Sequence, residues 1–207
     1  MKTIKSFLCV FFFSLPVLAS AQELAPVVQN VNNAKDVSEL IQVRSQLERF
    51  IVAQPQLWLA QYYLAYVDVQ LSFRVPDKIE KSQYLGEAEN SLNNLSAIKE
   101  TDKSEIYTLK GLRLYALIAS DPQTNGPKYS GEIINDYGTA LGINPNNPRA
   151  LILSTIFKKD MAKFMHQPYE EFQKDVDKAV TLFALENKTV LTPTWGKSWV
   201  DFALTKE

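Results

Sequence analysis

Side chains that could perform catalysis are few in this sequence, and they do not stand at productive spacings. The single histidine, His166, precedes Gln167-Pro168, and the sequence offers it no partner at the spacing of a metal or catalytic site. The carboxylates that follow it fall on the polar side of a predicted amphipathic helix, as is typical of a solvated surface: Glu170, Glu171, Asp175 and Asp177. No nucleophile–base pair, phosphate-binding loop or set of metal ligands is present. We therefore expect a protein that is not an enzyme and that holds no cofactor or metal.

Residues 121–130 form the longest stretch of turn-forming residues, which predicts a loop from Asp121 to Ser130. Asp121, Asn125 and Gly126 offer oxygen ligands for Ca²⁺, but they lack the dense acidic spacing of a calcium loop. A loop of this length more often docks a partner or only separates two helices.

The N-terminus has the pattern of a secretory signal peptide over residues 1–21. Lys2 and Lys5 precede an apolar run, and Ala19-Ser20-Ala21 supplies a small-residue cleavage pattern before Gln22. The run is shorter than the roughly 20 apolar residues of a membrane helix, so we expect cleavage rather than a retained anchor. Cleavage would remove Cys9, the only cysteine, and would exclude disulfides and cysteine chemistry from the mature chain.

The remaining chain is mildly acidic and of ordinary domain size. Loss of the two lysines from a chain with formal net charge −1 leaves a charge of about −3. The basic residues are scattered among acidic ones, which disfavours nucleic acid as a partner. We expect an exported protein, periplasmic or secreted, that is not an integral membrane protein after cleavage.

Helical periodicity dominates from residue 36 onward. Only seven glycines and no Val/Ile/Thr-rich alternation argue against a sheet. We expect a linker over 22–35 and one helical domain over 36–207. Its predicted helices cover 36–53, 56–75, 77–98, 102–119, 129–141, 148–164 and 168–185, with a short amphipathic helix in the aromatic tail.

Three of these helices carry similar apolar stripes at a step of 45 residues. Any amphipathic helices can be aligned to some degree, but two of the three stripes also end in a proline at the same spacing. The stripes are Val43, Leu47, Phe50 and Pro55; then Ala88, Leu92 and Leu95; then Ile133, Tyr137, Ala140 and Pro145.

This pattern resembles the tetratricopeptide repeat family. The resemblance rests on Ala140 followed by the segment 145–150, on Phe50 followed by Pro55, and on the small-residue steps Leu64-Ala65 and Lys110-Gly111. The step of 45 residues departs from the family's period of about 34, and no proline stands near Glu100. The signal peptide and the tail sequence 193–196 look like exported helical-repeat proteins of Gram-negative envelopes.

The resemblance implies an all-α fold, a right-handed array of antiparallel helical hairpins with about seven to eight helices and an aromatic C-terminal cap. In that family the first helix of each hairpin lines a concave groove. Carried over to this sequence, the groove-facing positions are Leu59, Tyr62, Tyr66, Glu105, Thr108, Leu112, Tyr115, Arg149, Ile152 and Ile156. The candidate binding residues among them are Tyr62, Tyr66, Leu112, Tyr115, Arg149 and Ile152. The same aromatic residues would also suit a packed core, or a surface that the tail covers.

The sequence leaves two functions open. The first is a non-enzymatic interaction module that docks a protein or peptide partner of the cell envelope through an apolar, aromatic groove. The alternative is a helical carrier that encloses a small apolar or lipid ligand between its hairpins. A small molecule that co-purifies with the protein would favour the carrier.

Overall fold

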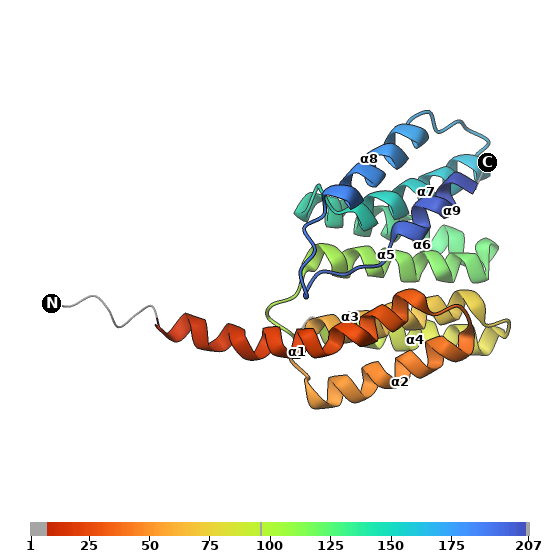
Figure 1. The fold of residues 1–207 in the computed structure, drawn as a ribbon. Coiled ribbons are helices and arrows are strands. Elements are labelled where there is room, and N and C mark those ends of the chain that lie inside the picture. Colours follow the sequence, from red (N-terminus) through yellow and green to blue (C-terminus); the bar gives the residue numbers. More distant parts are fainter. Residues whose placement is uncertain (1–7, 96, 206–207) are drawn as a thin grey trace.

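The computed structural model describes residues 8–95 and 97–205 of the chain, with side chains described from Ala21 onward. The described residues form nine helices and no strand, which confirms the all-α fold class (Figure 1). The helices are α1 (Leu8–Asn33), α2 (Val37–Ala53), α3 (Trp58–Arg74), α4 (Lys78–Leu95), α5 (Lys103–Ser120), α6 (Pro122–Ile143), α7 (Pro148–Phe164), α8 (Phe172–Leu185) and α9 (Lys197–Thr205).

Side-chain caps fix where several helices begin. Asp36 accepts a hydrogen bond from the backbone N–H of Glu39 at 2.9 Å at the start of α2, and Asp102 caps α5 in the same way. Asn147 accepts from the N–H groups of Arg149 and Ala150, both at 3.0 Å, at the start of α7. Each cap supplies an acceptor to N–H groups that have no partner within the helix.

Consecutive helices pack into hairpins, α3 with α4, α5 with α6 and α7 with α8. The first helices of these hairpins begin at Trp58, Lys103 and Pro148, 45 residues apart each time. α3 also contacts α5, and α5 contacts α7, so the first helices form a row across the molecule. The helices α2, α4 and α6 each bury one side, with Leu47 of α2, Leu92 of α4 and Tyr137 of α6 in the core.

The expected loop from Asp121 to Ser130 is instead the start of α6. Asp121 accepts from the backbone N–H of Thr124 at 3.2 Å, and Pro122 occupies the first helical position. Asn125 donates from Nδ2 to the carbonyl of Leu117 at 2.7 Å, and this bond ties the new helix to the end of α5. Capping residues and an initial proline favour a loop and a helix start alike, which is why composition predicted a loop here.

The described residues contain no group of three or more histidine, cysteine, aspartate or glutamate side chains that could hold a metal ion.

Residues 22–33, for which a linker was expected, are helical and continue α1. Leu24, Val28 and Val31 are buried against the rest of the protein, and α1 packs on α2 and α3. Their spacing of four and three residues forms an apolar stripe on one side of the helix. The earlier part of α1 projects away from the body (Figure 1). No helix in the described part of the chain is long and apolar enough to cross a membrane.

Candidate ligand-binding site

The candidate site lies where residues 186–196, here called the C-terminal segment, cross the row of first helices between α8 and α9 (Figure 1). Trp195 stacks on Tyr66 of α3 with ring centroids 4.3 Å apart, and its Nε1 donates to the hydroxyl of Tyr62 at 3.0 Å. The backbone N–H of Thr194 donates to the Tyr63 hydroxyl at 2.7 Å. The segment therefore covers the aromatic side of α3.

A buried ion-pair network lies under this segment. Arg149 donates from Nε to Oε1 of Glu105 at 2.9 Å, from Nη1 to the carbonyl of Trp195 at 3.2 Å, and from Nη2 to Glu186. Tyr62 donates to Oε2 of Glu105 at 2.7 Å. The side chains of Arg149 and Glu105 are only 2% and 3% exposed. The network joins α3, α5, α7 and the C-terminal segment in one closed set of bonds.

Electrostatics explain why both charges persist in the core. Burial raises the pKa of Glu105, and the positive charge of Arg149 opposes that rise. Burial also lowers the pKa of Arg149, but its pairing with Glu105 and Glu186 outweighs this effect and leaves the pKa raised. A buried charge whose partners are all within the protein stabilises a particular arrangement of helices rather than a ligand.

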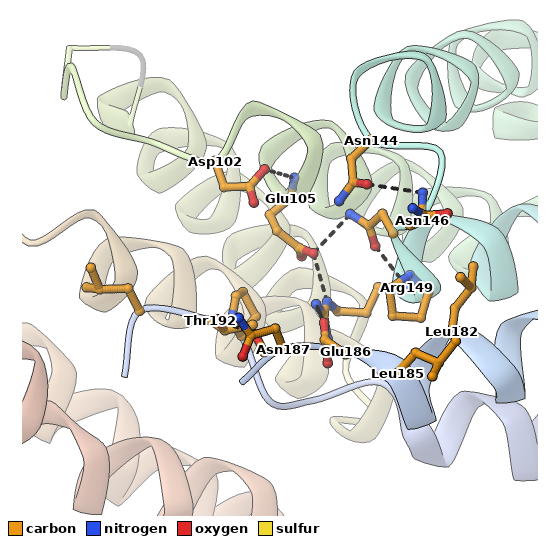
Figure 2. A pocket seen from close by; sticks show the side chains of 14 residues that line it. Asp102, Glu105, Asn144, Asn146, Arg149, Leu182, Leu185, Glu186, Asn187 and Thr192 are labelled. Atoms are coloured by element: carbon orange, nitrogen blue, oxygen red, sulfur yellow. Dashed lines mark hydrogen bonds and ion pairs between the residues drawn. The ribbon is translucent and has the colours of Figure 1, made fainter. Parts of the chain in front are cut away.

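A polar cavity of about 430 Å³ opens beside this network (Figure 2). Arg149, Glu105 and Glu186 point toward one another in it, and Asp102 and Asn144 cap neighbouring backbone N–H groups. The charged groups of this cavity already serve the network and the helix starts. The arrangement gives this cavity a structural role.

A second cavity, the apolar cleft, is lined by α1, α3 and the C-terminal segment and has a volume of about 430 Å³. Among the described residues that line it, Lys188 is the one charged residue and none is acidic. Ligand pockets are typically a few hundred Å³ in volume and mostly apolar, with a few polar groups. The lining residues are Ala25, Val28, Gln29 and Asn32 of α1, Leu59 of α3, and Lys188, Thr189, Val190, Thr192 and Thr194 of the C-terminal segment.

A third cavity, the basic cavity, adjoins the apolar cleft and has a volume of about 340 Å³. Asn32 and Thr194 line both, and Asn32 donates from Nδ2 to Oγ1 of Thr194 at 2.7 Å. These two side chains therefore belong to the walls of both cavities. The charged residues that line the basic cavity are Arg74 and Lys197.

The structure places the six predicted site residues in the interior. Tyr62, Leu112 and Ile152 are fully buried, and Tyr66 and Arg149 are 7% and 2% exposed. Tyr62, Tyr66 and Arg149 meet around Trp195, whereas Leu112 and Ile152 lie in the hydrophobic core. Partly buried Tyr115 donates to Oδ2 of Asp160 at 2.6 Å. The C-terminal segment covers the aromatic side of α3, where Tyr62 and Tyr66 lie. A role of the six residues in binding stays a prediction.

Among the described residues that line the apolar cleft, the sequence patterns identified Leu59 alone, as a groove-facing position. Ala25 and Val28 were placed in a linker, and Val190 stands in a stretch without helical periodicity. The stripe of Leu24, Val28 and Val31 was the one signal that could have identified a packed helix there.

No protein-family model and no curated protein matches the sequence. Among solved structures, the chain is similar to the HusA haemophore from Porphyromonas gingivalis, with a TM-score of 0.78. The sequences are 22% identical, and the match covers 90% of this chain and 91% of that chain. A likeness at this level of identity shows a shared all-helical fold.

Proposed function

We propose that this protein is an exported, non-enzymatic carrier that binds a small apolar ligand with an acidic group in the apolar cleft. The observation that carries the proposal is the composition of the cleft. Its lining is largely apolar, Lys188 is the one charged residue among the described residues that line it, and its volume of about 430 Å³ is that of a ligand pocket. A ligand there would exchange water for apolar contacts with α1 and α3.

The ligand class to examine first is the porphyrins. The structure similar in fold is that of a haemophore, and a porphyrin combines a flat apolar body with two carboxylates. Lys188 of the cleft and Arg74 and Lys197 of the neighbouring cavity match those carboxylates in charge. The absence of acidic residues from both linings avoids repulsion of an anionic ligand.

Iron ligation is not expected to contribute to binding. The described residues that line the cleft include no histidine, cysteine, methionine or tyrosine. His166 is exposed and lies just beyond the C-terminal end of α7. This helix is about 25 Å long, and the ion-pair network lies at its other end, so His166 is far from the network. Apolar contact and charge pairing would then dominate the affinity. We therefore expect iron-free protoporphyrin IX to bind as tightly as haem, within about threefold.

Replacement of one cleft residue tests the proposal directly. Val190→Asp places a carboxylate in the cleft and should weaken protoporphyrin binding by about tenfold or more, because the ligand would desolvate a charge of its own sign. The measurement is a titration monitored by porphyrin absorbance and tryptophan quenching. Val190 is 37% exposed, so the folded state should tolerate the change.

The matched control is Val180→Asp on α8, which makes the same change at a valine that is 47% exposed and lines none of the three cavities. It should bind protoporphyrin as the wild type does. Equal affinities for all three proteins, or no binding to any of them, would rule out the apolar cleft as the porphyrin site.

A second candidate function is the docking of an envelope protein or peptide, as in tetratricopeptide repeat proteins. The row formed by α3, α5 and α7 favours it, because such a row presents a continuous surface of first helices. Docking would require the C-terminal segment to leave that row. Native mass spectrometry of the exported protein separates the two functions, since a carrier should retain a small molecule and a docking module should not.

A further inference from the structure

We infer that the basic cavity is an anion subsite that receives a carboxylate of the ligand whose apolar part lies in the adjoining cleft. This inference rests on the proposed carrier function and names the part of the ligand that the second cavity recognises. Four features of the cavity support it, namely its charge, an unpaired amide donor, the start of a helix, and its contact with the cleft.

The charge of the cavity is purely positive. Arg74 at the end of α3 and Lys197 at the start of α9 line it, and no aspartate or glutamate of the described chain does. Neither Arg74 nor Lys197 forms an ion pair with any carboxylate of the described residues. The whole chain has a formal net charge of −1, so this positive lining runs against the average of the protein. Two cations facing one space attract an anion into it.

A buried amide donor in this lining has no acceptor. Gln70 lines the cavity, and its Nε2 atom is buried without a hydrogen-bond partner in the described part of the protein. Its Oε1 accepts from Nη1 of Arg74 at 2.8 Å, which fixes the amide so that the NH₂ group is the free end. A buried donor without an acceptor costs about 1–3 kcal/mol. Because Nε2 is shielded from solvent, a carboxylate held by Arg74 would supply the missing acceptor once the Gln70 amide turns toward the cavity.

The start of α9 adds a further favourable environment for an anion. α9 has nine residues and begins at Lys197, and Gly196, Lys197 and Ser198 all line the cavity. The first N–H groups of a helix carry partial positive charge and bind anions. Gly196 has φ 115°, and a Cβ there would come within 2.8 Å of Arg149 Cγ and 2.9 Å of Phe183 Cζ. Glycine thus allows the turn that places the helix start at the cavity.

The basic cavity and the apolar cleft together suit one amphipathic ligand. They share Asn32 and Thr194, whose side chains are hydrogen-bonded to each other. A ligand whose apolar body fills the cleft needs only to pass this pair for its charged end to reach Arg74, Gln70 and Lys197. The pairing of an apolar space with a positive one selects a ligand with both properties over a neutral apolar molecule.

The first test compares a charged ligand with its neutral ester. The double variant Arg74→Gln/Lys197→Gln should bind protoporphyrin IX at least about tenfold more weakly than the wild type, because hydrogen bonds to a charged group are lost. It should bind the dimethyl ester of protoporphyrin IX as the wild type does. The control Arg49→Gln/Lys178→Gln removes the same charge at exposed positions on α2 and α8 and should leave both affinities unchanged.

The result that overturns the anion subsite is an unchanged affinity of the double variant for protoporphyrin IX while Val190→Asp weakens it. That outcome leaves the carrier function standing. An equal loss of affinity for the acid and the ester also overturns the subsite, because the effect would then not depend on the carboxylate.

A second measurement reads the subsite without any porphyrin. In ¹⁵N spectra of the full chain, sodium propionate should shift the side-chain amide signals of Gln70 in the wild type, and the same concentration of sodium chloride should not. The shift should be lost in Arg74→Gln/Lys197→Gln. A Gln70 amide that does not respond to propionate overturns the subsite even if porphyrins bind, and a response without porphyrin binding supports the subsite while the carrier function fails.

Discussion

Arg149 carries a buried positive charge whose partners come from separate parts of the chain. Glu105 belongs to α5, Glu186 follows α8, and the accepting carbonyl is that of Trp195. The guanidinium also lies 6.0 Å from the ring centres of both Phe183 and Trp195. Removing one member of such a network leaves the remaining charges buried and unpaired, and that penalty exceeds the value of any single bond.

Arg149→Met should therefore lower the free energy of unfolding by about 3–5 kcal/mol, because Glu105 would keep a buried charge without its cation. Urea denaturation followed by circular dichroism measures the change. Arg113→Met is the matched control, since Arg113 also pairs with a carboxylate but that partner, Glu89, is 54% exposed. There the loss should be about 1 kcal/mol. Similar decreases in the free energy of unfolding in the two variants would show that burial does not determine how much the Arg149 network stabilises the protein.

The contact between α2 and α3 contains a buried carboxyl group. Arg44 of α2 donates from Nε to Oδ1 of Asp68 of α3 at 2.6 Å. The Asp68 side chain is fully buried, and its Oδ2 has no hydrogen-bond partner among the described residues. Burial raises the pKa of Asp68 to about 7, the pairing with Arg44 opposes that rise, and the nearby charges of Glu87 and Glu48 add to it. Between about pH 4 and pH 7, the folded state thus holds a proton that the unfolded chain has released.

The stability of the protein should fall as pH rises between about 4 and about 7 because of this residue. The folded state binds the Asp68 proton more tightly than the unfolded state does, so the contribution is complete below the unfolded pKa and is lost through the folded pKa. Asp68→Asn should remove this dependence. The difference in unfolding free energy between wild type and variant should change by a few kcal/mol across this range, since one pKa unit corresponds to about 1.4 kcal/mol.

Chemical denaturation at intervals of half a pH unit measures this difference. Comparison with Asp68→Asn isolates the residue, because burial also raises the pKa of Asp136 to about 6 and that group titrates in both proteins. A parallel pair of stability curves would show that Asp68 stays ionised throughout.

The molecule as a whole is closed by its C-terminal segment. Hairpin arrays hold together through contacts between neighbours, so distant hairpins can unfold separately. Here Trp195 contacts Tyr62 and Tyr66 of α3, while its carbonyl accepts from Arg149 of α7. The segment thus joins the first hairpin to the third. The ligand cavities lie along this connection, so their shape depends on it.

Trp195→Ala should uncouple the two ends of the molecule. We expect the free energy of unfolding to fall by about 3–5 kcal/mol. In the variant, amide hydrogens of α7 and α8 should exchange faster than those of α3 and α4. In the wild type, both pairs of helices should exchange through one global opening. Native-state hydrogen exchange measures both. Trp58→Ala removes another buried tryptophan, one that packs on Tyr62 within α3. That control should lower stability without separating the two rates, and identical exchange patterns in both variants would contradict the proposed connection.

The sequence by itself determined the helices and the interval between hairpins. Asp36, Asp102 and Asn147 directly precede the helices that they cap, and Pro148 is the first residue of α7, so these boundaries depend on local chemistry that is visible in a single stretch of chain. Local information was insufficient at residues 121–130 because capping residues and proline suit both loops and helix starts. The sequence patterns also predicted a linker where α1 is packed against the protein, because the apolar stripe of Leu24, Val28 and Val31 directly follows the predicted signal peptide.

Only the tertiary structure decided what the predicted groove residues contact and where ligand-sized cavities lie. The hydrogen bond between Trp195 and Tyr62 joins residues 133 positions apart, and that between Asn32 and Thr194 joins residues 162 apart. No periodicity or cap encodes such pairs, because they form only when the whole array places both ends of the chain on α3. Arg149 and Tyr62 were identified from the sequence as neighbours of a functional surface, but their burial followed from the return of the C-terminal segment.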